Sequence, residues 1–119
     1  MAAHNELGKY GEQLGVQYFS AKEYRVLHTN WKYSYFEIDL IACKNNVLHF
    51  IEIKTRQTKT FGEPEDDADK KKLSKIMKAA EEYQHRYPGW KRVQYDVLAI
   101  NLHANEPPAF YLIEDVYYW

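Results

Sequence analysis

The most regular pattern of apolar and polar residues lies in the middle of the chain, in two runs that flank Lys44-Asn45-Asn46. The runs span residues 36–43 and 47–54. Asparagine tolerates positive φ better than other residues with a side chain, and a type I′ turn needs positive φ at both central positions. The pattern therefore predicts a β-hairpin that turns at Asn45 and Asn46. Counting outward from that turn sets Asp39 opposite Glu52.

This register predicts one apolar face and one face that carries charge at the end away from the turn. The apolar face comprises Phe36, Ile38, Leu40, Ala42, Val47, His49, Ile51 and Ile53. The other face carries Glu37, Asp39, Glu52 and Lys54 at that end, and Ile41, Cys43, Leu48 and Phe50 nearer the turn.

Two carboxylates that oppose each other across strands repel, and a bound cation would neutralise them. Oxygen ligands suit Mg²⁺, Mn²⁺ or Ca²⁺ better than zinc. The alternative is a solvated strand end, at which Lys54 balances Glu37 or Glu52.

The apolar residues before and after the hairpin recur at helical spacing, which predicts one helix on each side of it in the sequence. A first helix is expected over residues 5–22, with Asn5 as its N-cap and Leu7, Tyr10, Leu14 and Tyr18 on one stripe. A second helix is expected over 68–86, ended by Pro88-Gly89, with a core stripe of Leu73, Ile76, Met77, Ala80 and Tyr83. Further strands are expected over 24–30, 93–102 and 110–113. The order is helix, three strands, helix and two strands, an α/β fold with a mixed central sheet.

Three glycines, at positions 8, 11 and 15, recur along one side of the first predicted helix. Each costs roughly 1 kcal/mol relative to alanine in a helix interior, so we expect close packing of this helix against the hairpin. Glu12 lies at the edge of that side, where an ordinary solvated glutamate is the simplest interpretation.

Composition restricts the classes of protein. The 119 residues are 45% hydrophobic and 28% charged, which indicates one globular domain over residues 1–119. No apolar run approaches a membrane span and the start lacks signal-peptide features, so we expect a cytoplasmic protein. The single cysteine excludes an internal disulfide and argues against structural zinc. A formal net charge of −1 gives nucleic-acid binding no support unless basic residues cluster locally.

The acidic strand residues carry a family resemblance. Asp39 followed by Glu52-Ile53-Lys54 resembles the PD-(D/E)XK nuclease signature. The longer pattern also resembles the uncharacterised bacterial YraN-like family, which is related to Holliday-junction resolvases. It consists of Gly11-Glu12, Glu37-Ile38-Asp39-Leu40-Ile41-Ala42, Glu52-Ile53-Lys54-Thr55-Arg56, Phe61-Gly62, Pro64 and Asp96-Val97. Phe36 departs from the pattern, which usually has glycine there.

The resemblance implies a restriction-endonuclease-like fold and a metal-dependent endonuclease of nucleic acid, DNA rather than RNA. It implies Mg²⁺ or Mn²⁺ as cofactor, with Glu12, Asp39, Glu52 and the Ile53 carbonyl as ligands. Asp39, Glu52 and Lys54 would be the catalytic residues. We predict nucleic-acid contacts at Arg25, Lys32, Arg56, Lys70 and Lys71, although a basic run on a helix is equally a solvated face.

Two alternatives to an active nuclease stay open. In the first, the chain is a nucleic-acid-binding module that keeps a nuclease fold without useful turnover. Phe36 and the weak overall charge favour this alternative. Otherwise it is a protein-interaction domain that uses the aromatic tail at residues 116–119. That tail and the analogy with resolvases also lead us to expect a homodimer.

Overall fold

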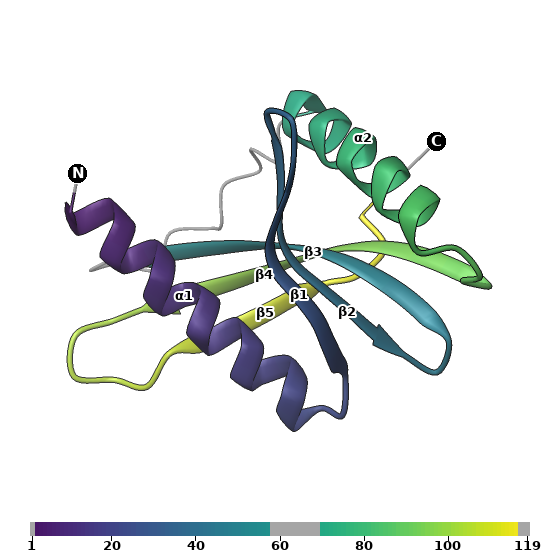
Figure 1. Ribbon diagram of the computed structural model, residues 1–119. Coiled ribbons are helices and arrows are strands. Elements are labelled where there is room, and N and C mark those ends of the chain that lie inside the picture. Colours follow the sequence, from purple (N-terminus) through teal and green to yellow (C-terminus); the bar gives the residue numbers. More distant parts are fainter. Residues whose placement is uncertain (1, 58–69, 117–119) are drawn as a thin grey trace.

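The computed structural model describes residues 2–57 and 70–116, which form one five-stranded mixed sheet with a helix on each face (Figure 1). The elements are α1 (Ala2–Ala21), β1 (Arg25–Tyr33), β2 (Phe36–Lys44), β3 (Val47–Gln57), α2 (Lys70–Arg86), β4 (Arg92–Leu102) and β5 (Ala109–Ile113). The strand order is β1-β2-β3-β4-β5, and only β3 and β4 run parallel. The predicted element order is confirmed.

The asparagine turn sets the register of the central hairpin, as predicted. Asn45 and Asn46 have φ angles of 54° and 66°, the positive values that a type I′ turn requires. Lys44 pairs with Val47, and the ladder continues in the same register to Leu40 and Ile51. Local chain chemistry therefore decides which residues of β2 and β3 lie opposite each other.

The prediction of a single apolar core face on this hairpin is wrong, because both faces are buried. Leu40, Ala42 and Ile51 pack with Phe19 of α1, whereas Ile41, Leu48 and Phe50 pack against α2. Ile38 joins the α2 cluster although it was expected beside Leu40. Ile38 lies in the part of β2 that pairs with β1 alone, beyond the last β2–β3 pair at Leu40. Figure 1 shows the β1–β2 hairpin extending away from β3.

Tyr83 of α2 is the centre of the core beneath that helix. It is 2% exposed, and its ring meets those of His28, Trp31 and Phe50 at centroid distances of 5.3, 5.3 and 5.7 Å in edge-on geometry. Burial, with the nearby Tyr87, raises the pKa of Tyr83 to about 12. Edge-to-face packing of aromatic rings is favourable beyond the area it buries, so this residue fixes α2 on both β1 and β3.

Helix α1 packs through small residues and one large one. Gly11 and Gly15 are buried, and a Cβ atom at Gly15 would lie 2.6 Å from Ile53 Cδ1. Phe19 is fully buried, whereas Tyr10 of the expected stripe is 45% exposed. The expected N-cap is also wrong: α1 begins at Ala2, so Asn5 lies inside the helix. Close packing against β3 is thus confirmed for Gly11 and Gly15, whereas the prediction is wrong for Gly8, which is exposed and has no atom within 4 Å of a Cβ position.

Several predictions fall on residues outside the described ranges. These are Phe61-Gly62 and Pro64 of the family pattern, the first two residues of the second predicted helix, and residues 117–119 of the aromatic tail. Val116 is described, and its amide donates to the Tyr95 carbonyl at 2.8 Å. None of the helices in the described ranges has the length and apolar character to span a membrane.

A glycine-to-alanine pair tests the close packing of α1. In Gly11→Ala the new methyl group would overlap the Thr55 hydroxyl and lie 3.0 Å from Thr55 Cβ. The variant should lose about 1–3 kcal/mol of unfolding free energy. Gly8→Ala is the matched control, because no atom lies within 4 Å of the added group. It should gain up to about 1 kcal/mol from helix propensity. Equal effects in urea denaturation would contradict the packing described.

Candidate functional site

The sheet forks where the acidic residues lie. The hydrogen-bonded ladder between β2 and β3 ends at Leu40 and Ile51, after which β2 continues with β1 and β3 continues with β4. Asp39 is the first residue beyond that end. Its Oδ2 atom accepts a hydrogen bond of 2.9 Å from the Ile53 amide. A carboxylate therefore replaces the next rung of the ladder and lies inside the opening between the two strands.

The strand on the other side of Asp39 is also irregular. The register of β1 with β2 pairs Thr29 with Leu40 and Trp31 with Ile38, which leaves Asn30 facing Asp39. Asn30 has a φ of 51°, a left-handed conformation in the middle of a strand. Its Nδ2 atom donates to Glu12 Oε1 of α1 at 2.9 Å. The predicted residue Glu12 is thus connected through Asn30 to the strand position beside Asp39.

Glu52 lies on β3 at the fork and is 3% exposed. A buried carboxylate is costly unless a positive charge or hydrogen bonds compensate it. Lys54 follows two residues later, half-buried and about 7 Å along the strand on the same side by alternation. Arg56 occupies the next such position and is also half-buried. Beta-strand geometry thus gives this side of β3 one buried acid followed by two bases.

The structure brings together only some of the predicted site residues. Asp39, Glu52, Ile53 and Lys54 line the two strands of the fork, while Arg25 pairs with Cys43 near the opposite end of β2. Lys32 pairs with Glu37, beyond Asp39 on the β1–β2 hairpin. Lys70 and Lys71 open α2, and their side chains fall outside the described part of the molecule.

The expected three-carboxylate cluster is not assembled. Within residues 2–57 and 70–116, no three histidine, cysteine, aspartate or glutamate side chains converge as a metal-binding group. The physical reason at Glu12 is its hydrogen bond to Asn30, which directs the glutamate toward β1. Of the predicted carboxylate ligands, Asp39 on β2 and Glu52 on β3 therefore remain as candidates for holding a metal.

A second polar group, centred on Asp96 of β4, was only partly foreseen. A hydrogen bond of 2.7 Å joins Asp96 Oδ2 to Nδ1 of His49, and both side chains are buried. Asp96 Oδ1 accepts from the Asp115 amide at 2.9 Å and from Gln94 Nε2 at 3.0 Å. Asp96 of the family pattern is thus held by two side chains and by a backbone amide. Arg92 forms an exposed ion pair with Asp115, at 3.7 Å.

One signal in the sequence points to His49: it is a polar residue within an otherwise apolar face of β3. It did not indicate the partner, because Asp96 lies 47 residues away. The resulting network holds the segment after β5 against the end of β3 near the asparagine turn. It is a structural group centred on His49 and Asp96, and it adjoins the fork, because Asp96 pairs with Ile51 at the last rung of the β2–β3 ladder.

Two substitutions test this network. Asp96→Ala removes the acceptor of three buried or half-buried donors, so we expect a loss of about 3–5 kcal/mol. Arg92→Ala breaks an ion pair whose side chains are 63% and 54% exposed, and should cost less than about 1 kcal/mol. Chemical denaturation of both variants measures the difference. An Asp96→Ala variant as stable as Arg92→Ala would contradict the structural role.

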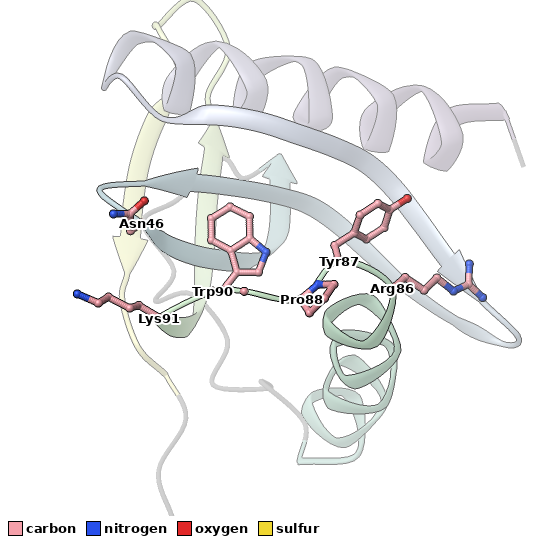
Figure 2. A pocket seen from close by; sticks show the side chains of 7 residues that line it. Asn46, Arg86, Tyr87, Pro88, Trp90 and Lys91 are labelled. Atoms are coloured by element: carbon pink, nitrogen blue, oxygen red, sulfur yellow. The ribbon is translucent and has the colours of Figure 1, made fainter.

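An open cavity of about 670 Å³ lies at the asparagine turn and the end of α2, away from the fork (Figure 2). It is lined by Asn46, Arg86, Tyr87, Pro88, Gly89, Trp90 and Lys91. Figure 2 shows the Trp90 ring between Asn46 and Tyr87, while the charged ends of Arg86 and Lys91 point away from the ring. The polar groups therefore do not converge on one ligand, and the cavity contains none of the predicted catalytic residues.

Comparison with known proteins assigns the chain to a family. The model of uncharacterised protein family UPF0102 matches residues 11–100, which include the whole fork. The chain belongs to UPF0102. The YraN-like resemblance is thereby confirmed at the level of this family.

Relatives within UPF0102 match most or all of their length. A UPF0102 protein of Christiangramia forsetii is 42% identical over 100 residues, 84% of each chain. One from Flavobacterium johnsoniae is 34% identical over 123 residues and covers both chains completely. One from Dictyoglomus turgidum is 37% identical over 100 residues, 83% of this chain and 85% of its own. These UPF0102 names state no activity.

Proposed function

We propose that this UPF0102 protein is a metal-dependent nuclease of the PD-(D/E)XK superfamily that hydrolyses phosphodiester bonds in nucleic acid, DNA rather than RNA. The observation that carries the proposal is the fork, where a buried glutamate and an aspartate lie on separating strands and a lysine follows the glutamate by two residues. The mixed sheet, with one helix before it and one between β3 and β4, is consistent with a restriction-endonuclease-like core.

The donor set fits Mg²⁺ or Mn²⁺. Magnesium is commonly held by one or two carboxylates together with waters and substrate phosphates, so three protein carboxylates are not required. Asp39 accepts the Ile53 amide through Oδ2, and its carboxylate would be one of the acidic ligands. When bound, the metal would polarise a phosphate oxygen and lower the pKa of a water.

The Ile53 carbonyl is the third donor in this proposal. The amide and the carbonyl of one residue in an extended strand point to the same side of that strand. Since the Ile53 amide points to Asp39, its carbonyl also faces the fork. The backbone of β3 therefore supplies a neutral oxygen next to two acidic side chains.

Lys54 has the role of a fixed positive charge. Its place on β3, two residues beyond Glu52, puts the ammonium group on the same side of the strand. There it would orient the attacking water and stabilise negative charge that develops on the phosphate. Glu12, bound to Asn30, would support the β1 side of the fork rather than act as a direct ligand.

Glu52→Gln tests the proposed reaction. The substitution keeps the shape of the side chain and removes its charge, so Mg²⁺-dependent cleavage of DNA should fall by at least about 100-fold. Glu106→Gln, in the exposed turn between β4 and β5, is the matched control and should cleave as the wild type does. Gel assays on linear, nicked and branched DNA would measure this. Full cleavage by Glu52→Gln would remove Glu52 from the mechanism.

A pair of variants at Asp39 separates its two tasks. Asp39→Asn keeps a side-chain oxygen for the Ile53 amide, so stability should change by less than about 1 kcal/mol while cleavage is lost. Asp39→Ala should lose cleavage and a further 1–3 kcal/mol, roughly the cost of an unsatisfied amide. Thermal unfolding and cleavage are measured on both proteins. Cleavage by Asp39→Asn at the wild-type rate would contradict the metal-ligand role.

The second candidate is a nucleic-acid-binding module without useful turnover. The bulky Phe36, where the family pattern usually has glycine, and the formal net charge of −1 favour it. It predicts salt-dependent binding with no cleavage in Mn²⁺ over several DNA and RNA forms. The homodimer expected from the apolar tail stays a prediction, to be checked by light scattering.

A further inference from the structure

The tip of the β1–β2 hairpin carries the most exposed large hydrophobic side chain of the described residues. Tyr35 is 96% exposed, whereas the other large hydrophobic side chains on the surface range from 36% to 47%. It sits with Ser34 in the turn between the paired residues Tyr33 and Phe36, and Ser34 has a φ of 58°. Figure 1 shows this hairpin projecting past the rest of the sheet, beside α2. The turn therefore displays one ring on a stiff two-stranded support.

Cations from α2 brace the hairpin below that tip. The Arg86 guanidinium lies 5.6 Å from the Trp31 ring centroid and 5.9 Å from that of Tyr33. The Lys78 ammonium lies 5.9 Å from the Phe36 ring centroid. These are cation–π distances, and they fix the hairpin on the helix.

The charges around the hairpin are mixed but include basic groups that remain accessible. Arg86 donates from Nε to Glu82 at 2.8 Å, and Lys32 lies opposite Glu37 across the strands. The Arg86 side chain is still 52% exposed, and Lys32 and Lys78 are exposed. Aromatic rings interleaved with accessible cations are typical of surfaces that hold single-stranded nucleic acid by stacking and phosphate contacts.

The turn at the tip leads directly into β2, the strand that carries Asp39. Tyr35 precedes Asp39 by four residues, a separation of about 13 Å at the rise of a β-strand. Stacked nucleotides of one strand are spaced by about 3.4 Å, so this separation corresponds to about four nucleotides. A nucleic acid bound at Asp39 and Glu52 would therefore reach Tyr35 within half a helical turn.

We propose that Tyr35 is a specificity-determining residue that stacks on an unpaired base and thereby directs the protein to boundaries between single-stranded and double-stranded nucleic acid. The bases of a continuous duplex already stack on each other and offer no free face to a projecting ring. A base next to the end of pairing offers that face. This inference rests on the proposed function, since it assigns a substrate class to the same site.

The test compares two DNA probes of equal length, one fully paired and one with a central unpaired bubble. Because both have the same ends, the ratio of their affinities reports the unpaired bases alone. Binding is measured by fluorescence anisotropy in Ca²⁺ buffer, and 2-aminopurine at the first unpaired position reports stacking. The wild type should prefer the bubble and quench 2-aminopurine.

Tyr35→Ala should weaken bubble binding by about 5- to 150-fold, lower the bubble-to-duplex ratio and abolish quenching. Tyr35→Trp should restore all three. Tyr111→Ala is the matched control, because this tyrosine on β5 is 47% exposed and lies on another part of the sheet. It should behave as the wild type. Circular dichroism confirms folding of each variant.

The outcomes separate this inference from the proposed function. If Tyr35→Ala binds both probes as the wild type does, or weakens both equally, selection by stacking is wrong, while cleavage that depends on Glu52 would still support the nuclease. If Tyr35→Ala loses only the bubble preference and no protein cleaves, the stacking role stands and the nuclease fails. A wild type that binds neither probe overturns both.

Discussion

The geometry of the candidate site depends on one hydrogen bond, from the Ile53 amide to the Asp39 carboxylate. It occupies the place where the β2–β3 ladder would otherwise continue, so the strands separate there without leaving this amide unsatisfied. The separation directs β2 toward β1 and β3 toward β4. In a continuous sheet, the backbone groups of β2 and β3 would bond to each other at this point. Here the Ile53 backbone and the acidic side chains of both strands face the fork instead.

Packing on both faces of the sheet supports the strands of the fork. Helix α1 approaches β3 through Gly11 and Gly15, and α2 is held by the aromatic contacts of Tyr83. The two clusters share the same central strands but no residues, so each helix stabilises a different face. At the other end of β3, the His49–Asp96 network holds the final segment of the described chain. A fork between strands needs such support, because it lacks part of the hydrogen bonding that normally holds neighbouring strands together.

The distribution of polar groups also separates three regions with different tasks. The fork combines acids with Lys54, the Asp96 network is structural and centred on two buried side chains, and the hairpin tip presents Tyr35 to solvent. The overall charge of −1 conceals this arrangement, since it averages over surfaces that face different directions. Function in this small fold is therefore better judged from where charges and rings are placed than from their sum.

The sequence by itself determined the element order, the asparagine turn and the hairpin register from Lys44 and Val47 to Leu40 and Ile51, because turn geometry and strand alternation are local properties. It also indicated the close packing of α1, because glycine has a cost that only tight contact offsets. Tertiary structure decided what covers each face of the hairpin, where β2 leaves β3, that Glu12 turns to Asn30 and that His49 meets Asp96. Those outcomes depend on contacts between residues 18 to 47 positions apart, and no short-range pattern encodes which distant partner a side chain will meet.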